Sequence, residues 1–473
     1  MTDKIRFLLA LTAPLLVLRA AQAQAADPPQ AQTIHTVKLQ VGPAPEPRYA
    51  LQYRFETPYM EQRPGDGALL YQMAIAQSLE TNSGALALDG DTLRQWYDSP
   101  IEELPLEEVR AAIGRFQQTF HFLGLAAESE TCTWEYPARE EGFQYMTPQL
   151  VQYRTLFRLL ALKARLEVHD DDFEAALKTL RTGYCMARDV GAGPSMIQHL
   201  VGLSIAAGIT DQVEALIQKP GAPNLYWALT VLPDPPIDPR AAMEMESAVL
   251  YRELPELLTL EDKALSNAQA TELWQKAIAL AGLDWRGSGQ WMEKTWLTVK
   301  LMKQYPQAKA HLRERGYPAD KVESWAPLYV VLLDQHHEFR RVRDMCFKWA
   351  YVPYTQAAEG LKQAEREVSR LWEDAGPFAA ALPAMYRVGF LRTRLARDIA
   401  ILRCVEAIRM YAADHDGKLP GALADITKVP VPTDPLRGAP FHYELTGDTT
   451  ILESPIPPDG GPRDGLRYEI TLK

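Results

Sequence analysis

The chain has 473 residues, 47% apolar and 23% charged, which is enough apolar material for two or three globular cores or one elongated repeat-like body. Its net charge of −11 argues against a nucleic-acid partner, because modules that bind the phosphate backbone tend to be basic. Beyond the N-terminus, the most apolar run covers only residues 200–209. A membrane-spanning helix needs about 20 such residues, so we expect a buried core helix there.

The N-terminus has the pattern of a secretory signal peptide. Lys4 and Arg6 precede an apolar run over residues 7–18, and two small-x-small motifs over 21–25 offer cleavage sites. An uncleaved anchor is the alternative, because Arg19 is an unusual residue so close to the cut. The first cysteine is Cys132, which argues against a lipoprotein. We therefore expect residues 1–25 to be removed and the product to be soluble and exported, either periplasmic or secreted.

Residues 26–65 are expected to be a linker with a short β segment. Apolar residues alternate over 37–41 and again over 49–55, with a proline-rich stretch between them. This pattern predicts a marginal hairpin or a pair of edge strands. From residue 66 the period becomes helical, and Leu69, Met73, Ala76 and Leu79 form an apolar stripe spaced by four, three and three residues.

Residues 66–384 are expected to form a body of stacked antiparallel helices. The clearest pattern predicts helices over 149–168, from 173 onwards, and over 195–218, with Asp170 to Asp172 capping the second. This stacking is similar to tetratricopeptide repeats, although the sequence has no regular 34-residue self-similarity. Two proline-rich connectors bracket a short helix at 224–231, and breaks follow near 287–289, 316–318 and 351–353.

Residues 385–473 are expected to form a long helix, over 385–413, and a small β module. Strands are predicted at 441–445, 449–453 and 468–472, with a tight turn at 446–448. The predicted fold is therefore mainly α: stacked antiparallel helices, a short N-terminal β segment and a small α+β C-terminal module.

Six blocks of the chain carry a resemblance to a known family: residues 50–54 (ALQYR), 64–71 (PGDGALLY), 132–134 (CTW), 163–167 (KARLE), 219–233 (KPGAPNLYWALTVLP) and 237–240 (IDPR). These blocks resemble an expanded family of exported proteins from planctomycete bacteria. The family has no established activity, so the resemblance implies a lineage and no reaction.

The C-terminal segment is also similar to the globular end of type II secretion pseudopilins, through residues 417–420 (GKLP), 434–438 (DPLRG) and 440–443 (PFHY). A pseudopilin needs an apolar N-terminal helix as its membrane anchor. The corresponding helix here is internal and carries Arg392, Arg394, Arg397, Asp398 and Arg403. At a bilayer centre each charge would cost about 2.5–3.5 kcal/mol, so the implied likeness is one of fold and not of assembly.

Four polar or aromatic clusters have the residue types of a ligand site, but a structural role is favoured for each. Asp414 to Gly417 could bind calcium but has the pattern of a helix C-terminus. His169 with Asp170 to Asp172 invites a metal but has the pattern of a turn and cap. Trp285 and Trp291 flank a glycine loop that could stack on sugars, although tryptophans that anchor helices to a core are commoner.

The fourth cluster is His336, His337 and Glu338, with Asp334 and Asp344 nearby. It lacks the H-E-x-x-H spacing of a zinc site, and we expect a surface helix there. The serines include no nucleophile elbow, since Ser288 lacks the required spacing, and no P-loop or dinucleotide motif occurs. Adjacent acids at 102–103, 107–108 and 140–141 are expected to be solvated faces.

The cysteines, Cys132, Cys185, Cys346 and Cys404, are sparse and contain no C-x-x-C pair. Export would permit a disulfide, but isolated buried thiols are the favoured interpretation. We expect no metal and no cofactor.

These features favour a non-catalytic exported protein that presents a stacked-helix surface to another envelope protein. The alternatives are an exported hydrolase with a dispersed acidic or histidine site, and an accessory part of a secretion or pilus-like apparatus. A scaffold predicts an apolar surface without converging ionisable groups, and a hydrolase predicts a deep pocket lined by perturbed acids or histidines. The secretion alternative predicts a free-standing C-terminal module.

Overall fold

The computed structural model describes residues 34–83, 87–134, 149–280, 298–374, 376–457, 460–461 and 464–473. Over these residues the protein is mainly α with small sheets, which confirms the expected fold class. The chain forms two compact units. The terminal unit contains described residues from 34–137, 145–245 and 387–473, and the insert unit contains those from 246–386. The predicted signal peptide, residues 1–25, lies outside the described residues.

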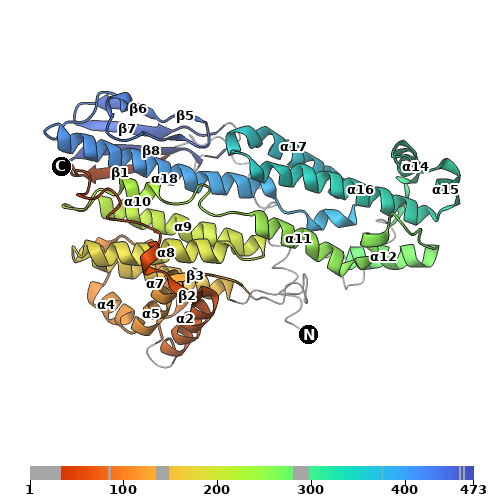
Figure 1. Ribbon diagram of the computed structural model, residues 1–473, viewed down its shortest axis with the longest axis horizontal. Helices are drawn as coiled ribbons and strands as arrows, with labels where there is room; N and C mark the ends of the chain where they lie inside the picture. Colours follow the sequence, from red (N-terminus) through yellow and green to blue (C-terminus); the bar gives the residue numbers. More distant parts are fainter. Residues whose placement is uncertain are drawn as a thin grey trace. The chain divides into compact units, whose positions relative to one another are not determined.

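The terminal unit is built around three consecutive helices that lie side by side in Figure 1: α7 (Leu150–His169), α8 (Phe173–Gly191) and α9 (Met196–Ile217). All three confirm the predicted pattern. Other helices of this unit are α2 (Gly67–Thr81), α3 (Gly90–Asp98), α4 (Leu106–Gly114), α5 (Gln117–Ala127) and α10 (Tyr226–Thr230), with short 3-10 helices η2 (Tyr59–Glu61) and η3 (Ile101–Glu103).

A side-chain cap and two glycines shape the connections and the packing of these helices. The side chain of Asp172 accepts from the backbone N–H of Ala175 at 3.1 Å and so caps α8. Between α8 and α9, the backbones approach closely at two glycines. A Cβ atom added to Gly202 would lie 2.4 Å from the Cα of Gly191. Only glycine fits at this crossing.

Helix α9 passes the length and composition test for a membrane-spanning helix, the only described helix to do so, and most of it is buried within the protein. Core helices meet the same test. Residues 200–209, predicted to be a buried core helix, lie inside α9, where Val201, Leu203, Ile205 and Ile209 are buried.

The two ends of the described chain meet in one sheet of order β1-β8-β7-β6. Strand β1 (His35–Val41) pairs in parallel with β8 (Leu466–Leu472), and β8, β7 (Thr449–Ser454) and β6 (His442–Thr446) are antiparallel. The three predicted C-terminal strands are confirmed. Helix α18 (Met385–Asp414) runs beside this sheet in Figure 1. Two short pairs, β2 (Arg63–Asp66) with β3 (Ser129–Thr131) and β4 (Thr433–Asp434) with β5 (Ala439–Pro440), and the 3-10 helix η8 (Leu423–Asp425) complete the unit.

The predicted N-terminal hairpin is wrong, because only its first half is a strand. Residues 49–55 form turns, and the proline-rich stretch before them is held by α18. The backbone N–H of Ala44 donates to the carbonyl of Arg409 at 3.1 Å, and the Arg409 side chain donates to the carbonyl of Gly42 at 2.9 Å. These contacts direct the chain away from β1, so β1 pairs with the distant strand β8.

A fully buried polar cluster explains the structural role of the 219–240 block. Arg409 and Glu406 are 1% and 0% exposed and form an ion pair at 2.7 Å. The second Glu406 carboxylate oxygen accepts from the backbone N–H of Leu225 at 3.0 Å, and Asn224 donates to the Glu406 carbonyl at 2.8 Å. The block thus ties α18 to the loop before α10.

The terminal unit has one continuous apolar core that includes residues from α7 to α10, from α18 and from β7 and β8. The C-terminal strands therefore do not stand free of the helices. The two units do not follow the segments expected from the sequence, 26–65, 66–384 and 385–473. Residues 387–473 belong to the same unit as residues 34–137.

The insert unit is helical. It contains most of α11 (Arg240–Glu253), α12 (Asn267–Leu280), α14 (Tyr305–Glu314), α15 (Ala319–Ser324), α16 (Pro327–Phe347) and α17 (Tyr354–Glu373), with 3-10 helices η5 (Pro255–Thr259), η6 (Lys348–Tyr351) and η7 (Pro377–Ala381). Helix α16 contacts α12, α14 and α17, and it is therefore the central element of this unit.

Candidate functional site

Helix α16 carries the histidine-rich segment that was predicted to lie on a surface helix, and this prediction is wrong. Asp334 and His336 are only 5% and 2% exposed, because neighbouring helices cover α16. The two histidines point to different partners: His336 Nε2 lies 3.4 Å from the hydroxyl of Tyr251, and His337 Nε2 lies 3.1 Å from that of Tyr317. The segment therefore does not converge on one point, as a metal site would require.

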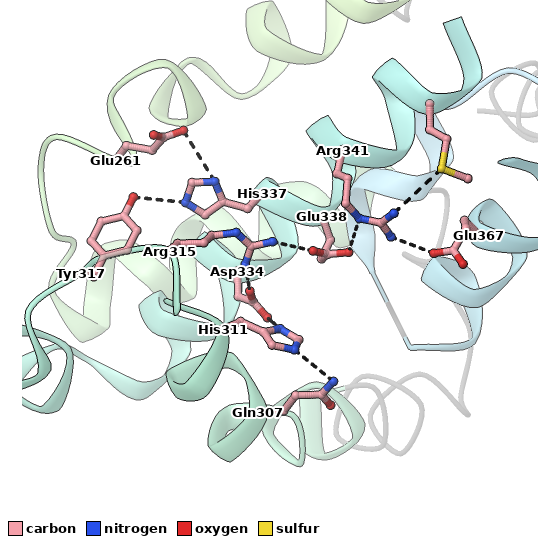
Figure 2. A network of polar contacts seen from close by, with 11 residues as sticks. Glu261, Gln307, His311, Arg315, Tyr317, Asp334, His337, Glu338, Arg341 and Glu367 are labelled. Carbon is pink, nitrogen blue, oxygen red and sulfur yellow. Dashed lines mark hydrogen bonds and ion pairs between the residues drawn. The ribbon is translucent and has the colours of Figure 1, made fainter. Parts of the chain in front are cut away.

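A chain of alternating charges links α14 to α16 (Figure 2). His311 Nδ1 lies 3.0 Å from one carboxylate oxygen of Asp334, and Arg315 donates to the other at 2.8 Å. Arg315 also donates to Glu338 at 2.5 Å, and Arg341 donates to the second Glu338 oxygen at 2.9 Å. Both carboxylates therefore hold two partners each.

The same network continues to α17, because Arg341 also donates to Glu367 at 2.7 Å. Burial raises the pKa of Asp334, although His311 and Arg315 act to lower it. For Glu338, desolvation acts to raise the pKa, but Arg341 and Arg315 together lower it below its usual value.

The His311–Asp334 pair has the orientation of a general base held by a carboxylate, as in hydrolases. Such a base needs a hydroxyl or thiol nucleophile at its other ring nitrogen. In this structure His311 Nε2 faces the side-chain amide of Gln307 at 3.4 Å. The network therefore links three helices, α14, α16 and α17. It does not form a hydrolytic triad.

A second group of acids lies in the terminal unit, on α9 and α18. Desolvation raises the pKa of Glu214 to about 7, and the hydroxyl of Tyr468 donates to this carboxyl group. The side chain of Asp211 is exposed, but desolvation by the surrounding protein raises its pKa to about 6, and the negative charge of Asp398 adds to this shift. Burial also raises the pKa of Asp398, against the effect of Arg397 at 2.9 Å. Within the described ranges, no group of three or more potential ligands could hold a metal ion.

A recess of about 280 Å³ opens between α5, α7 and α8. Phe120, Gly124 and Leu160 give it an apolar lining, and Lys163 and Lys178 bring positive charge to it. No pattern in the sequence marks this recess, because its residues come from three helices and lie up to about 120 positions apart when Arg63 of β2 is included.

Two of the other three predicted clusters have the structural roles expected of them. Gly417 has φ +76 and donates to the carbonyl of Ala412 at 2.9 Å, which ends α18. After α7, Asp170 accepts two hydrogen bonds from Arg110, at 2.6 and 2.9 Å, while Asp172 caps α8. These two clusters are therefore a helix C-terminus and a turn with a cap.

All four cysteines are free, and Cys185, Cys346 and Cys404 are buried, as isolated thiols would be. The adjacent acids at 102–103 and 107–108 are exposed. Trp285, Trp291, Ser288 and the acids at 140–141 lie outside the described residues.

Helix α2 is unusual because its apolar stripe faces away from the core. Leu69, Met73 and Leu79 are 67%, 40% and 52% exposed, and Ala76 is exposed with them. The opposite side of the helix, with Tyr71, Ala74 and Ile75, is buried. The sequence predicted the helix and its stripe, but the stripe is not the side that packs on the protein.

Comparison with protein-family models, with curated proteins and with solved structures finds no match to this chain.

Proposed function

We propose that the protein is an exported, non-catalytic helical scaffold that binds another envelope protein through the outer face of α2. The outer face consists of Leu69, Met73, Ala76 and Leu79. The observation that carries the proposal is that α2 is apolar on both sides, while only one side is covered within the chain. A helix that is apolar all round is normally buried all round.

The absence of charge over residues 67–79 of α2 indicates the kind of partner. From residue 67 to 79 the sequence (GALLYQMAIAQSL) has no charged side chain, although 23% of the whole chain is charged. The central part of a protein–protein interface is depleted in charged residues and enriched in groups such as Met. The outer face of α2 therefore suits an amphipathic helix of the partner, whose uncharged, apolar side packs against it.

Two further residues of the same stretch of chain are exposed and apolar. Tyr59 and Met60, in η2, are 80% and 90% exposed. They add exposed apolar side chains to the segment of chain that leads into α2. The N-terminal signal pattern supports export and therefore a partner in the envelope.

The test is site-specific photo-cross-linking in the native envelope, with the cross-linker at position 73 in one protein and at position 258 in another. Leu258 is a matched control, since it is 66% exposed but lies in the insert unit. We expect one defined partner to be captured from position 73 only.

The same capture is then repeated with the Leu69→Glu, Leu79→Glu double variant. Removing apolar anchors of an interface costs about 2 kcal/mol or more, so capture should fall by more than about tenfold. Stability should barely change, because substitutions on exposed faces are usually within about 0.5 kcal/mol. Equal capture from positions 73 and 258, or capture that survives the double variant, would contradict the proposal.

A further inference from the structure

The recess between α5, α7 and α8 has the construction of a small binding site. Its volume is about 280 Å³, close to the lower end of the range for small-molecule pockets. Phe120 and Leu160, on two different helices, are 9% and 2% exposed and supply an apolar surface. Gly124 also lines the recess, and a Cβ atom added there would meet no atom within 4 Å. The space in front of Gly124 is therefore open.

The charges around the recess do not cancel. Arg63 pairs with Glu128 at 2.8 Å, and Lys163 pairs with Glu167. Lys178 lines the same recess, is exposed, and forms no ion pair with the residues that the structure describes. The lining therefore carries one positive charge in excess, that of the exposed Lys178.

The paired lysine is held in position and does not compete with Lys178 for a ligand. Lys163 Nζ donates to the hydroxyl of Thr179 at 2.9 Å and lies 5.8 Å from the centre of the Phe120 ring. The Thr179 hydroxyl and the Glu167 carboxylate therefore accept two of its three protons, and the ion pair to Glu167 offsets its charge. Lys178 is left as the cation that is free to meet an incoming anion.

We propose that this recess binds a small amphipathic carboxylate, with its apolar group against Phe120 and Leu160 and its carboxylate at Lys178. The apolar group gains by leaving water, and the carboxylate gains a charge-assisted hydrogen bond from the lysine. A positively charged ligand is disfavoured by the excess charge. A neutral ligand of the same shape keeps only the apolar contribution.

The experiment measures binding of 3-phenylpropionate to the full mature chain by ligand-observed NMR and calorimetry. The neutral 3-phenylpropanol and the cationic phenethylamine serve as matched probes. A ligand of this size is expected to bind with a dissociation constant of millimolar order. We expect the carboxylate to bind about tenfold more tightly than the alcohol, as one charge-assisted contact would give, and the amine not to bind.

Two variants test the placement of the ligand. Lys178→Gln should weaken binding of the carboxylate to the level of the alcohol, which should itself bind as before. Gly124→Leu should fill the recess and abolish binding of both. Lys418→Gln and Gly114→Leu are the controls, because Lys418 is also exposed and Gly114 also faces open space. Both controls should bind like the unsubstituted protein.

Three results would overturn the proposal: no binding of the carboxylate to the unsubstituted protein, unchanged binding to a folded Gly124→Leu protein, or equal binding of the amine. If the leucine variant does not fold, Gly124→Ala and the lysine variant still decide the question. The alanine should weaken binding by a smaller factor, and unchanged affinities in both proteins would exclude this site.

Discussion

Glu214 on α9 illustrates how one half-buried side chain makes stability depend on pH. Desolvation raises its pKa in the folded protein to about 7, whereas an unfolded glutamate titrates near 4.3. Between these values the folded protein retains a proton that the unfolded chain has released. The stability that Glu214 contributes is therefore present at low pH and is lost as the pH rises from about 4.3 to about 7.

We predict that the free energy of unfolding falls less between pH 5 and pH 7.5 in Glu214→Gln than in the unsubstituted protein. The difference should be about 1–3 kcal/mol. The measurement is the free energy of unfolding in urea at several pH values, expressed as the difference between the two proteins. The difference is needed because His199, whose pKa burial lowers to about 4, has the opposite effect below pH 6.5. Glu107→Gln, at an exposed site on α4, is the control. Identical pH profiles for Glu214→Gln and the unsubstituted protein would refute the prediction.

At the scale of secondary-structure elements, the close crossing of α8 and α9 depends on Gly202 and Gly191. A Cβ atom on Gly202 would lie 2.4 Å from Gly191 Cα and 2.6 Å from the carbonyl oxygen of Ala187. Both contacts are with backbone, so the helices would have to separate.

We therefore predict that Gly202→Ala destabilises the terminal unit by about 1–3 kcal/mol, the usual cost of overpacking. Gly124→Ala is the matched control, since the same methyl group there meets open space and alanine is the better helix former. Thermal unfolding of the two variants checks this. A melting temperature of Gly202→Ala at or above that of Gly124→Ala would show that the crossing can adapt.

Most elements could be predicted from the sequence because their signals are local. The period of α7 to α9, the cap at Asp172 and the turn at Gly417 depend on residues within one or two helical turns. The side of α2 that faces the core could not be predicted, because Tyr71 and Ile75 on one side are as apolar as Leu69 and Met73 on the other. The periodicity then predicts a helix but does not show which of its sides faces the core.

The candidate sites could not be predicted for a different physical reason. The charges of α16 suggest a surface helix until their partners are known, and those partners, such as His311 and Arg315, lie about 20 positions earlier in the chain. The recess depends on Phe120, Leu160 and Lys178, which come together only when three helices pack. Neither arrangement leaves a pattern of spacing that a single sequence reveals.

At the scale of the whole molecule, the terminal unit closes only when the two ends of the described chain meet. The core-facing residues of β1 are Leu39 and Val41, both 0% exposed, and they pair in register with Ile470 and Leu472 of β8. Parallel pairing between such distant strands requires the intervening helices to fold around them. Among the described residues, the continuous apolar core of this unit includes none from the insert unit.

We predict that Leu39→Ala destabilises the terminal unit by about 2–5 kcal/mol, the range for removing a buried leucine side chain. Hydrogen exchange should then accelerate in β8, β7 and α18, which share its core, while α14 and α16 of the insert unit keep their protection. Lys38→Ala, on the exposed side of the same strand, should leave all of these rates unchanged. If α16 were to lose protection together with β8, the two units would be one cooperative body, and the ends of the chain would control the stability of both.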